Sequence, residues 1–103
     1  MAASSWKVTE FDVVRAKVVE VVNRKEDRVV SLDAIAADHA GMIRTFSSSG
    51  RMLIHMGTTD NGGYLSVSNK TDESTADIAA DDYGNGEIDA YNRKGKGRVW
   101  RSR

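Results

Sequence analysis

The sequence contains no cysteine and no proline, and these two absences limit its chemistry and its turns. Without cysteine the chain can form neither a disulfide nor a thiolate metal site, and the absence fits a reducing compartment. Without proline, its turns must be made by glycine, asparagine, aspartate and serine. No apolar run is long enough for a signal peptide or a membrane-spanning helix, so we expect a cytoplasmic protein without membrane contact.

Charge is balanced overall but unevenly distributed along the chain. Fifteen acidic and fifteen basic residues give a net charge of zero. Residues 1–59 carry +1, residues 60–92 carry −7, and residues 93–103 carry +6. An acidic body beside a basic C-terminal segment indicates either head-to-tail contact between chains or an anionic partner.

After a short N-terminal extension, the sequence has an internal repeat of roughly 23 residues. Three stretches begin at Val18, Met42 and Tyr64, and a truncated fourth begins at Glu87. Each opens with an apolar or alternating segment, which is followed by a polar turn, a second such segment and a second turn. The first turns recur at nearly constant intervals, and they begin at Asn23, Ser47, Asn69 and Asn92.

The composition of each unit predicts strands separated by tight turns. Segments such as 64–68 and 87–91 alternate with the two-residue period of a strand. The turns are rich in asparagine, aspartate and glycine, which tolerate positive φ. The second turns are also in phase, since Asp60 and Asp82 are separated by nearly the same interval as the first turns. We therefore expect an all-β fold.

The N-terminal part of the chain allows two interpretations. Phe11, Val14, Val18 and Val21 lie at heptad spacing, which is typical of a short coiled coil. The same stretch is dense in valine, so we prefer a strand from Val13 onward. The predicted parts of the chain are an N-terminal extension, 1–12, a β-repeat domain, 13–92, and a basic C-terminal segment, 93–103.

A single repeat unit is too small to fold alone, because two short strands cannot bury their own apolar face. The later units are also poor in large aliphatic residues, so a monomer of 103 residues would be marginally stable. We therefore favour a homo-oligomer, an intertwined homotrimeric β-prism or β-spiral in which three chains close a shared core. A monomeric β-solenoid, an antiparallel meander and an irregular small β-sandwich are the alternatives.

A finer motif recurs within the units: a strand, an Asn/Asp-x-x-Gly-Lys/Arg turn, a second strand, Leu-Gly-x-Asp and a glycine-rich turn. Residues 47–51, 56–63 and 92–96 match it, whereas Glu26 and Asp72 occupy positions where glycine is expected. In these residues the chain resembles uncharacterised bacterial proteins built from tandem β-repeats. The resemblance covers most of the chain after residue 13, and it implies a β-repeat fold without implying an activity.

Residues 81–89 look like an EF-hand calcium loop. Such a loop needs oxygen ligands at positions one, three, five, seven and nine, and a bidentate glutamate at position twelve. Here position three would be Tyr83 and position twelve would be Asn92, and flanking helices are lacking. We interpret the segment as a turn of the repeat, with weak calcium binding at an acidic corner as the alternative, and we predict no metal site and no cofactor.

The other reactive side chains form no recognisable catalytic pattern. His39 and His55 are the only histidines and lie in different phases of the repeat, so we expect structural roles for both. Residues 47–50 lack the surroundings of a nucleophile elbow or a P-loop. We expect Asp60 and Asp82 to bind their own turn amides rather than to form an acid/base pair. The sequence thus predicts no catalytic residue and no enzyme.

The basic C-terminal segment is the sharpest candidate for a contact with a partner. Basic residues interleaved with glycine and one tryptophan can hold phosphates and stack a base. The acidic remainder of the chain opposes polyanion binding, so we favour a solvated segment or one docked on the acidic block of a neighbouring chain. The residues that would make this anion or partner contact are Arg93, Lys94, Lys96, Arg98, Trp100 and Arg101.

Together, these patterns predict a non-enzymatic structural or assembly module that oligomerises with copies of itself. The alternative is a binding module. It would use the repeat corners for a carbohydrate or a cation, or the basic segment for nucleic acid.

Overall fold

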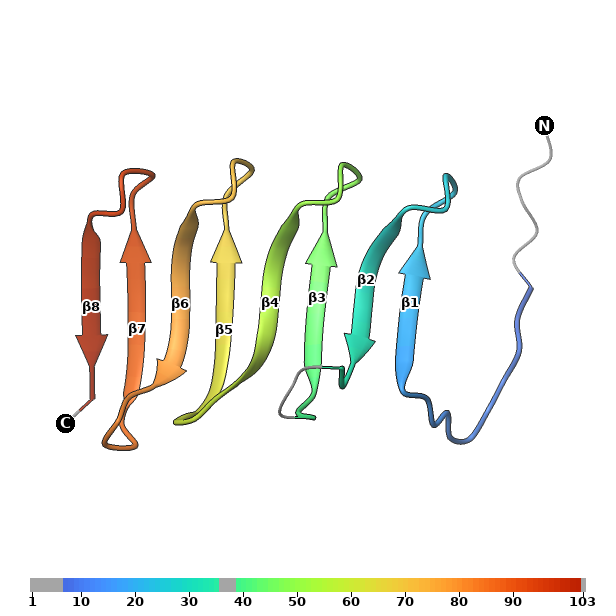
Figure 1. Ribbon diagram of the computed structural model, residues 1–103, viewed down its shortest axis with the longest axis horizontal. Coiled ribbons are helices and arrows are strands. Elements are labelled where there is room, and N and C mark those ends of the chain that lie inside the picture. The colour runs from blue at the N-terminus through green and yellow to red at the C-terminus, as the bar shows by residue number, and fades with distance from the viewer. Residues whose placement is uncertain (1–6, 36–38, 103) are drawn as a thin grey trace.

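The computed structural model describes residues 7–35 and 39–102, and these residues form strands and no helix (Figure 1). The strands are β1 (Val18–Val22), β2 (Arg28–Asp33), β3 (Met42–Phe46), β4 (Met52–Thr59), β5 (Gly62–Ser68), β6 (Ser74–Ala80), β7 (Gly86–Tyr91) and β8 (Gly97–Arg101). The all-β prediction is therefore confirmed. In the part of the chain that is described, no helix is long and apolar enough to cross a membrane.

All eight strands belong to one open sheet, in which every strand lies antiparallel to the next one along the chain. The chain therefore runs as a meander from one end of the sheet to the other, and β1 and β8 are the two edge strands (Figure 1). This path is the antiparallel meander that stood among the alternatives. The described residues form a single layer, so neither face of the sheet is covered by a second one.

Five of the connections between strands share one hairpin geometry. The first turn residue donates its amide to the carbonyl of the fifth residue and accepts the amide of the fourth. Its side-chain oxygen also accepts the amide of the fifth residue, as in the asparagine and aspartate turns expected from the sequence. The first residues of these turns are Asn23, Ser47, Asn69, Asp81 and Asn92.

The fourth residue of each such turn has a positive φ, which only glycine adopts without strain. Glycine fills this position in three of the turns, at Gly50, Gly84 and Gly95. Glu26 and Asp72 adopt the same conformation, with φ of 68° and 71°. The two residues that depart from the sequence motif therefore adopt the backbone conformation that glycine would have. This strain costs about 1 kcal/mol of stability for each residue.

Two boundaries differ from the sequence prediction. Residues 11–17 form neither helix nor strand, so the strand expected from Val13 is wrong in its start. The strand begins at Val18, because Val18 pairs with Asp33 at the very end of β2 and earlier residues have no strand opposite them. The basic segment is not a separate tail, because β8 pairs along its whole length with β7.

Strand alternation gives the sheet two different faces. On one of them, which we call the apolar face, the register aligns a row of Val19, Leu32, Ile43, Met56, Leu65, Ile78, Ile88 and Trp100. A second row on this face consists of Val21, Val30, Thr45, Ile54, Val67, Ala76, Ala90 and Arg98. The opposite, polar face has a central row of Glu20, Ser31, Arg44, His55, Ser66, Asp77, Asp89 and Val99.

The sheet has no hydrophobic core of its own. Among the described residues no hydrophobic side chain is buried, and the two buried residues, Ser31 and Asp33, are polar. The accessible surface is 8466 Å², whereas a folded monomer of 11.3 kDa exposes about 5,700 Å². The radius of gyration is 17.2 Å, against about 13 Å for a compact domain of this length. A single chain therefore leaves exposed much of the surface that a compact domain of the same length would bury.

Candidate functional site

The apolar face is the most extensive candidate surface. Its first row crosses all eight strands without a polar residue, over seven interstrand spacings that span about 34 Å. Ile78 and Ile88 are each 50% exposed, and Trp100 at the β8 end is 51% exposed. Contiguous exposed apolar surface marks an interaction site for a protein, a membrane or a ligand, whereas single exposed apolar residues are ordinary. The arrangement can bind another apolar sheet.

The polar face carries an ion pair near the N-terminal end of the sheet. Arg44 on β3 donates to Asp33 on β2 at 2.8 Å and to the Ser31 hydroxyl at 3.2 Å. The Asp33 side chain is only 1% exposed. Burial by itself would raise the pKa of Asp33, but the hydrogen bonds from Arg44 and from the Ile35 amide, with the charge of Arg44, outweigh it and lower the pKa. This pair ties β2 to β3.

Arg44 also lies near the ring of Phe46 on the same face. The guanidinium groups of Arg28 and Arg44 lie 4.4 Å and 5.7 Å from the centre of the Phe46 ring. Such cation–π contacts hold long side chains flat against the sheet. The polar face is therefore packed by its own side chains, which explains why it is less exposed than the apolar one.

His55 and Tyr64 form a neighbouring pair on β4 and β5. The Tyr64 hydroxyl lies 3.0 Å from the ring nitrogens of His55, and the two rings meet edge to face at 5.0 Å. Burial, followed by the charge of Arg44, lowers the pKa of His55. The histidine faces a phenol rather than a nucleophile, so this geometry fits the structural role expected from the sequence. His39, by contrast, is exposed and has a φ of 61°.

A cluster of carboxylates lies on the polar face towards the C-terminus. Asp77 and Asp89 are directly opposite each other on β6 and β7, and one oxygen of Asp89 is buried without a hydrogen-bond partner. Burial raises the pKa of Asp89, and the charges of Glu87 and Asp77 raise it further, although a hydrogen bond with Tyr91 acts in the opposite direction. Across residues 7–35 and 39–102, no group of three or more ligand side chains is arranged to hold a metal ion.

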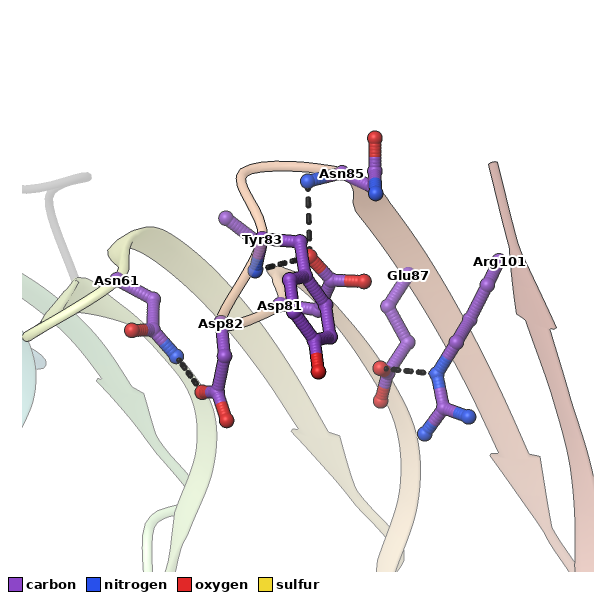
Figure 2. A pocket seen from close by; sticks show the side chains of 8 residues that line it. Asn61, Asp81, Asp82, Tyr83, Asn85, Glu87 and Arg101 are labelled. Atoms are coloured by element: carbon purple, nitrogen blue, oxygen red, sulfur yellow. Dashed lines mark hydrogen bonds and ion pairs between the residues drawn. The ribbon is translucent and has the colours of Figure 1, made fainter. Parts of the chain in front are cut away.

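The acidic corner that resembles a calcium loop forms a hollow between the β4–β5 turn, the β6–β7 turn and β8 (Figure 2). Asp81 accepts the amides of Tyr83 and Asn85 at 2.9 Å and 2.8 Å. Glu87 accepts a hydrogen bond from Arg101 at 2.8 Å, as Figure 2 also shows. These carboxylates already have partners within the chain, so the corner is built as a turn.

The residues that bind turn amides are displaced by one from the sequence prediction. Asp82 accepts from the Asn61 side chain of the adjacent turn at 2.8 Å, and Asp81 takes the role that was expected of Asp82. In the β4–β5 turn, the hydroxyl of Thr59 rather than Asp60 accepts the Asn61 amide, at 3.1 Å. The prediction for both aspartates is wrong, because the turn begins one residue earlier than the repeat spacing indicated.

The basic residues near the C-terminus do not converge on one site. Arg93, Lys94 and Lys96 lie in the β7–β8 turn. On β8 itself, Arg98 and Trp100 belong to the apolar face, and Arg101 lies on the polar face with Glu87. The hydrogen bond to Glu87 raises the pKa of Arg101. A single anion could not contact all six predicted residues, because they lie on two faces and a turn.

No protein-family model matches the chain, and no curated protein is significantly similar to it. Function is therefore inferred from the geometry of the sheet. The sequence predicted an apolar face that other copies would have to bury, but it did not show how the residues of that face align across the sheet. Its signal was present in the two-residue alternation of each strand, but the alignment of the strands into rows depends on their register.

Proposed function

We propose that this protein is a non-enzymatic structural module that assembles with copies of itself by burying its apolar faces in a shared core. The observation that carries the proposal is the apolar row across all eight strands, which no other part of the described chain covers. Burying exposed apolar surface is the dominant favourable term in association.

The amount of surplus surface is of the size that an obligate interface needs. The chain exposes 8466 Å², which is about 2,700 Å² more than a compact monomer of its mass exposes. Obligate homo-oligomers bury about 2,000–5,000 Å² in total. Assembly through one face of each sheet would therefore bring the surface of each chain towards that of an ordinary folded domain.

A threefold prism is the arrangement that we favour for this assembly. The strands have 5–8 residues, which corresponds to about 17–26 Å for each side of a triangular cross-section. The centre of such a triangle lies about 5–8 Å from each side, close to half the spacing of about 10 Å between packed sheets. Apolar side chains from three sheets would thus fill the centre. The predicted repeat units would stack along the axis as successive pairs of strands.

The binding alternative has less support from the geometry. The carboxylates of the acidic corner are engaged by Asn61, Arg101 and backbone amides. The basic residues are divided between the two faces and a turn. A carbohydrate, cation or nucleic acid would therefore have to displace contacts within the chain.

Size-exclusion chromatography with light scattering tests the proposal directly. One chain has a mass of 11.3 kDa. We expect a particle with three times that mass. Melting should also depend on protein concentration, because folding and assembly are coupled. A stable, folded species of 11.3 kDa at micromolar concentration would overturn the proposal.

A further inference from the structure

The segment before β1 has a strand-like sequence but pairs with no strand among the residues that the structure describes. Residues 7–14, which we call the arm, contain neither helix nor strand and lie outside β1 at the end of the sheet (Figure 1). Their large apolar side chains are solvent-exposed, including Phe11 at 68% and Val13 at 81%. Within the arm, residues 9–13 have the two-residue alternation of a strand. The side chains of Thr9, Phe11 and Val13 would lie on one face of the strand, and those of Glu10 and Asp12 on the other.

At the opposite end of the sheet, no strand of the described residues pairs with the outer edge of β8. The Ser102 amide donates to the Gly86 carbonyl at 3.0 Å, which sets the hydrogen-bonding phase of this strand pair. Alternation then directs the backbone groups of Arg98 and Trp100 towards β7, and those of Val99 and Arg101 towards the open edge. Every residue of β8 is exposed. Unpaired edges of this kind are templates for a further strand.

We propose that the arm of one copy adds as a further strand to the β8 edge of a second copy. Phe11 would lie beside Trp100 and extend the apolar row by one aromatic residue. A carboxylate of the arm would lie beside Arg101 on the polar face. That carboxylate is Glu10 if the arm runs antiparallel to β8 and Asp12 if it runs parallel, so the complementarity holds in both directions.

The occupant of this edge must come from another copy. Phe11 precedes Val18 by seven residues, which reach about 25 Å when fully extended. β8 is separated from β1 by seven interstrand spacings, or about 34 Å. Arm and edge lie at opposite ends of the sheet, so the contact is head-to-tail and does not close on itself. It would join assemblies end to end, which goes beyond the burial of the apolar face.

Disulfide trapping in the full-length chain tests this contact, because the native chain has no cysteine. A Phe11→Cys chain and a Trp100→Cys chain, carrying different tags, are mixed and oxidised. We expect a covalent heterodimer on a non-reducing gel. The matched control pairs Phe11→Cys with Val99→Cys, whose side chain lies on the opposite face of β8. Equal yields from the two pairs, or no product from the first, would overturn the proposal.

Charge reversal gives a second readout that keeps both aromatic residues. We expect Glu10→Lys with Asp12→Lys to remove species larger than the trimer in sedimentation velocity, because in either direction of the arm one of the two lysines would lie beside Arg101. The control, Glu26→Lys with Asp60→Lys, makes the same change in charge at two exposed turn positions and should keep them. Loss of the larger species in both variants, or in neither, would contradict the arm contact. Trapping without any trimeric assembly would instead refute the proposed burial of the apolar face.

Discussion

A charge placed in the middle of the apolar face is the most decisive test of the assembly. Ile78 lies on β6 in the first apolar row, between Leu65 and Ile88, and is half exposed in a single chain. Burying the remaining half of this side chain is worth about 1 kcal/mol in each copy. Ile78→Asp loses this burial free energy. It also places an unpaired carboxylate in the shared core, which costs several kcal/mol more.

In a threefold assembly the three substituted residues lie at the same level, so their costs combine. The total is on the order of 10 kcal/mol per trimer, enough to lower the association constant by about seven orders of magnitude. Light scattering should therefore show the Ile78→Asp chain as a monomer or as an unfolded chain. Val22→Asp is the matched control and should leave the trimer intact, because Val22 is 47% exposed, lies opposite Arg28 on the edge strand β1 and belongs to neither apolar row. A trimeric particle that survives Ile78→Asp would refute the reasoning.

Three smaller predictions concern single residues. The raised pKa of Asp89 means that its contribution to stability is present below pH 3.8 and is lost as the pH rises through the raised value. Asp89→Asn should therefore raise the melting temperature at pH 7 and have no such effect below pH 3.8, and equal gains at both pH values would count against the carboxylate cluster. The lowered pKa of Asp33 gives stability that is present above pH 3.8 and is lost as the pH falls through the lowered value. Arg44→Met should thus shift acid unfolding to higher pH, as followed by circular dichroism, and an unchanged midpoint would contradict the ion pair. Glu26→Gly should raise the free energy of unfolding in urea by up to about 1 kcal/mol, since glycine adopts the φ of 68° without strain; a loss of stability would contradict that account.

Secondary structure was predictable here because local chemistry and tertiary structure agree. Residues 64–68 and 87–91 alternate as strands do, and they lie within β5 and β7. Asn23 and Asn92 begin turns in which their own side chains accept two backbone amides, so the residue type alone indicates the turn. The sequence also indicated the positive φ of Glu26, because the motif has glycine at that position.

What the sequence could not provide is the register between strands. The start of β1 depends on where β2 ends, so the valines near residue 13 have a strand-like sequence but no residue of β2 opposite them. Asp81 and Asp82 are equivalent by composition, and only the hydrogen bonds distinguish the turn residue from its neighbour. The polar cluster of Asp33 and Arg44 joins residues eleven positions apart, which no local spacing indicates.

The fall in aliphatic content along the chain affects only one of the two apolar rows. In the second row, Ile54 and Val67 on β4 and β5 give way to Ala76 and Ala90 on β6 and β7. The first row keeps large side chains to its end at Trp100. A prism built from such sheets would be narrower towards the C-terminal end, because alanines allow the sheets to approach. We therefore expect Ala90→Leu to destabilise the assembly by about 1–3 kcal/mol through overpacking, measured as a lower melting temperature at fixed concentration. An increase in melting temperature would mean that this end of the core is open rather than narrow.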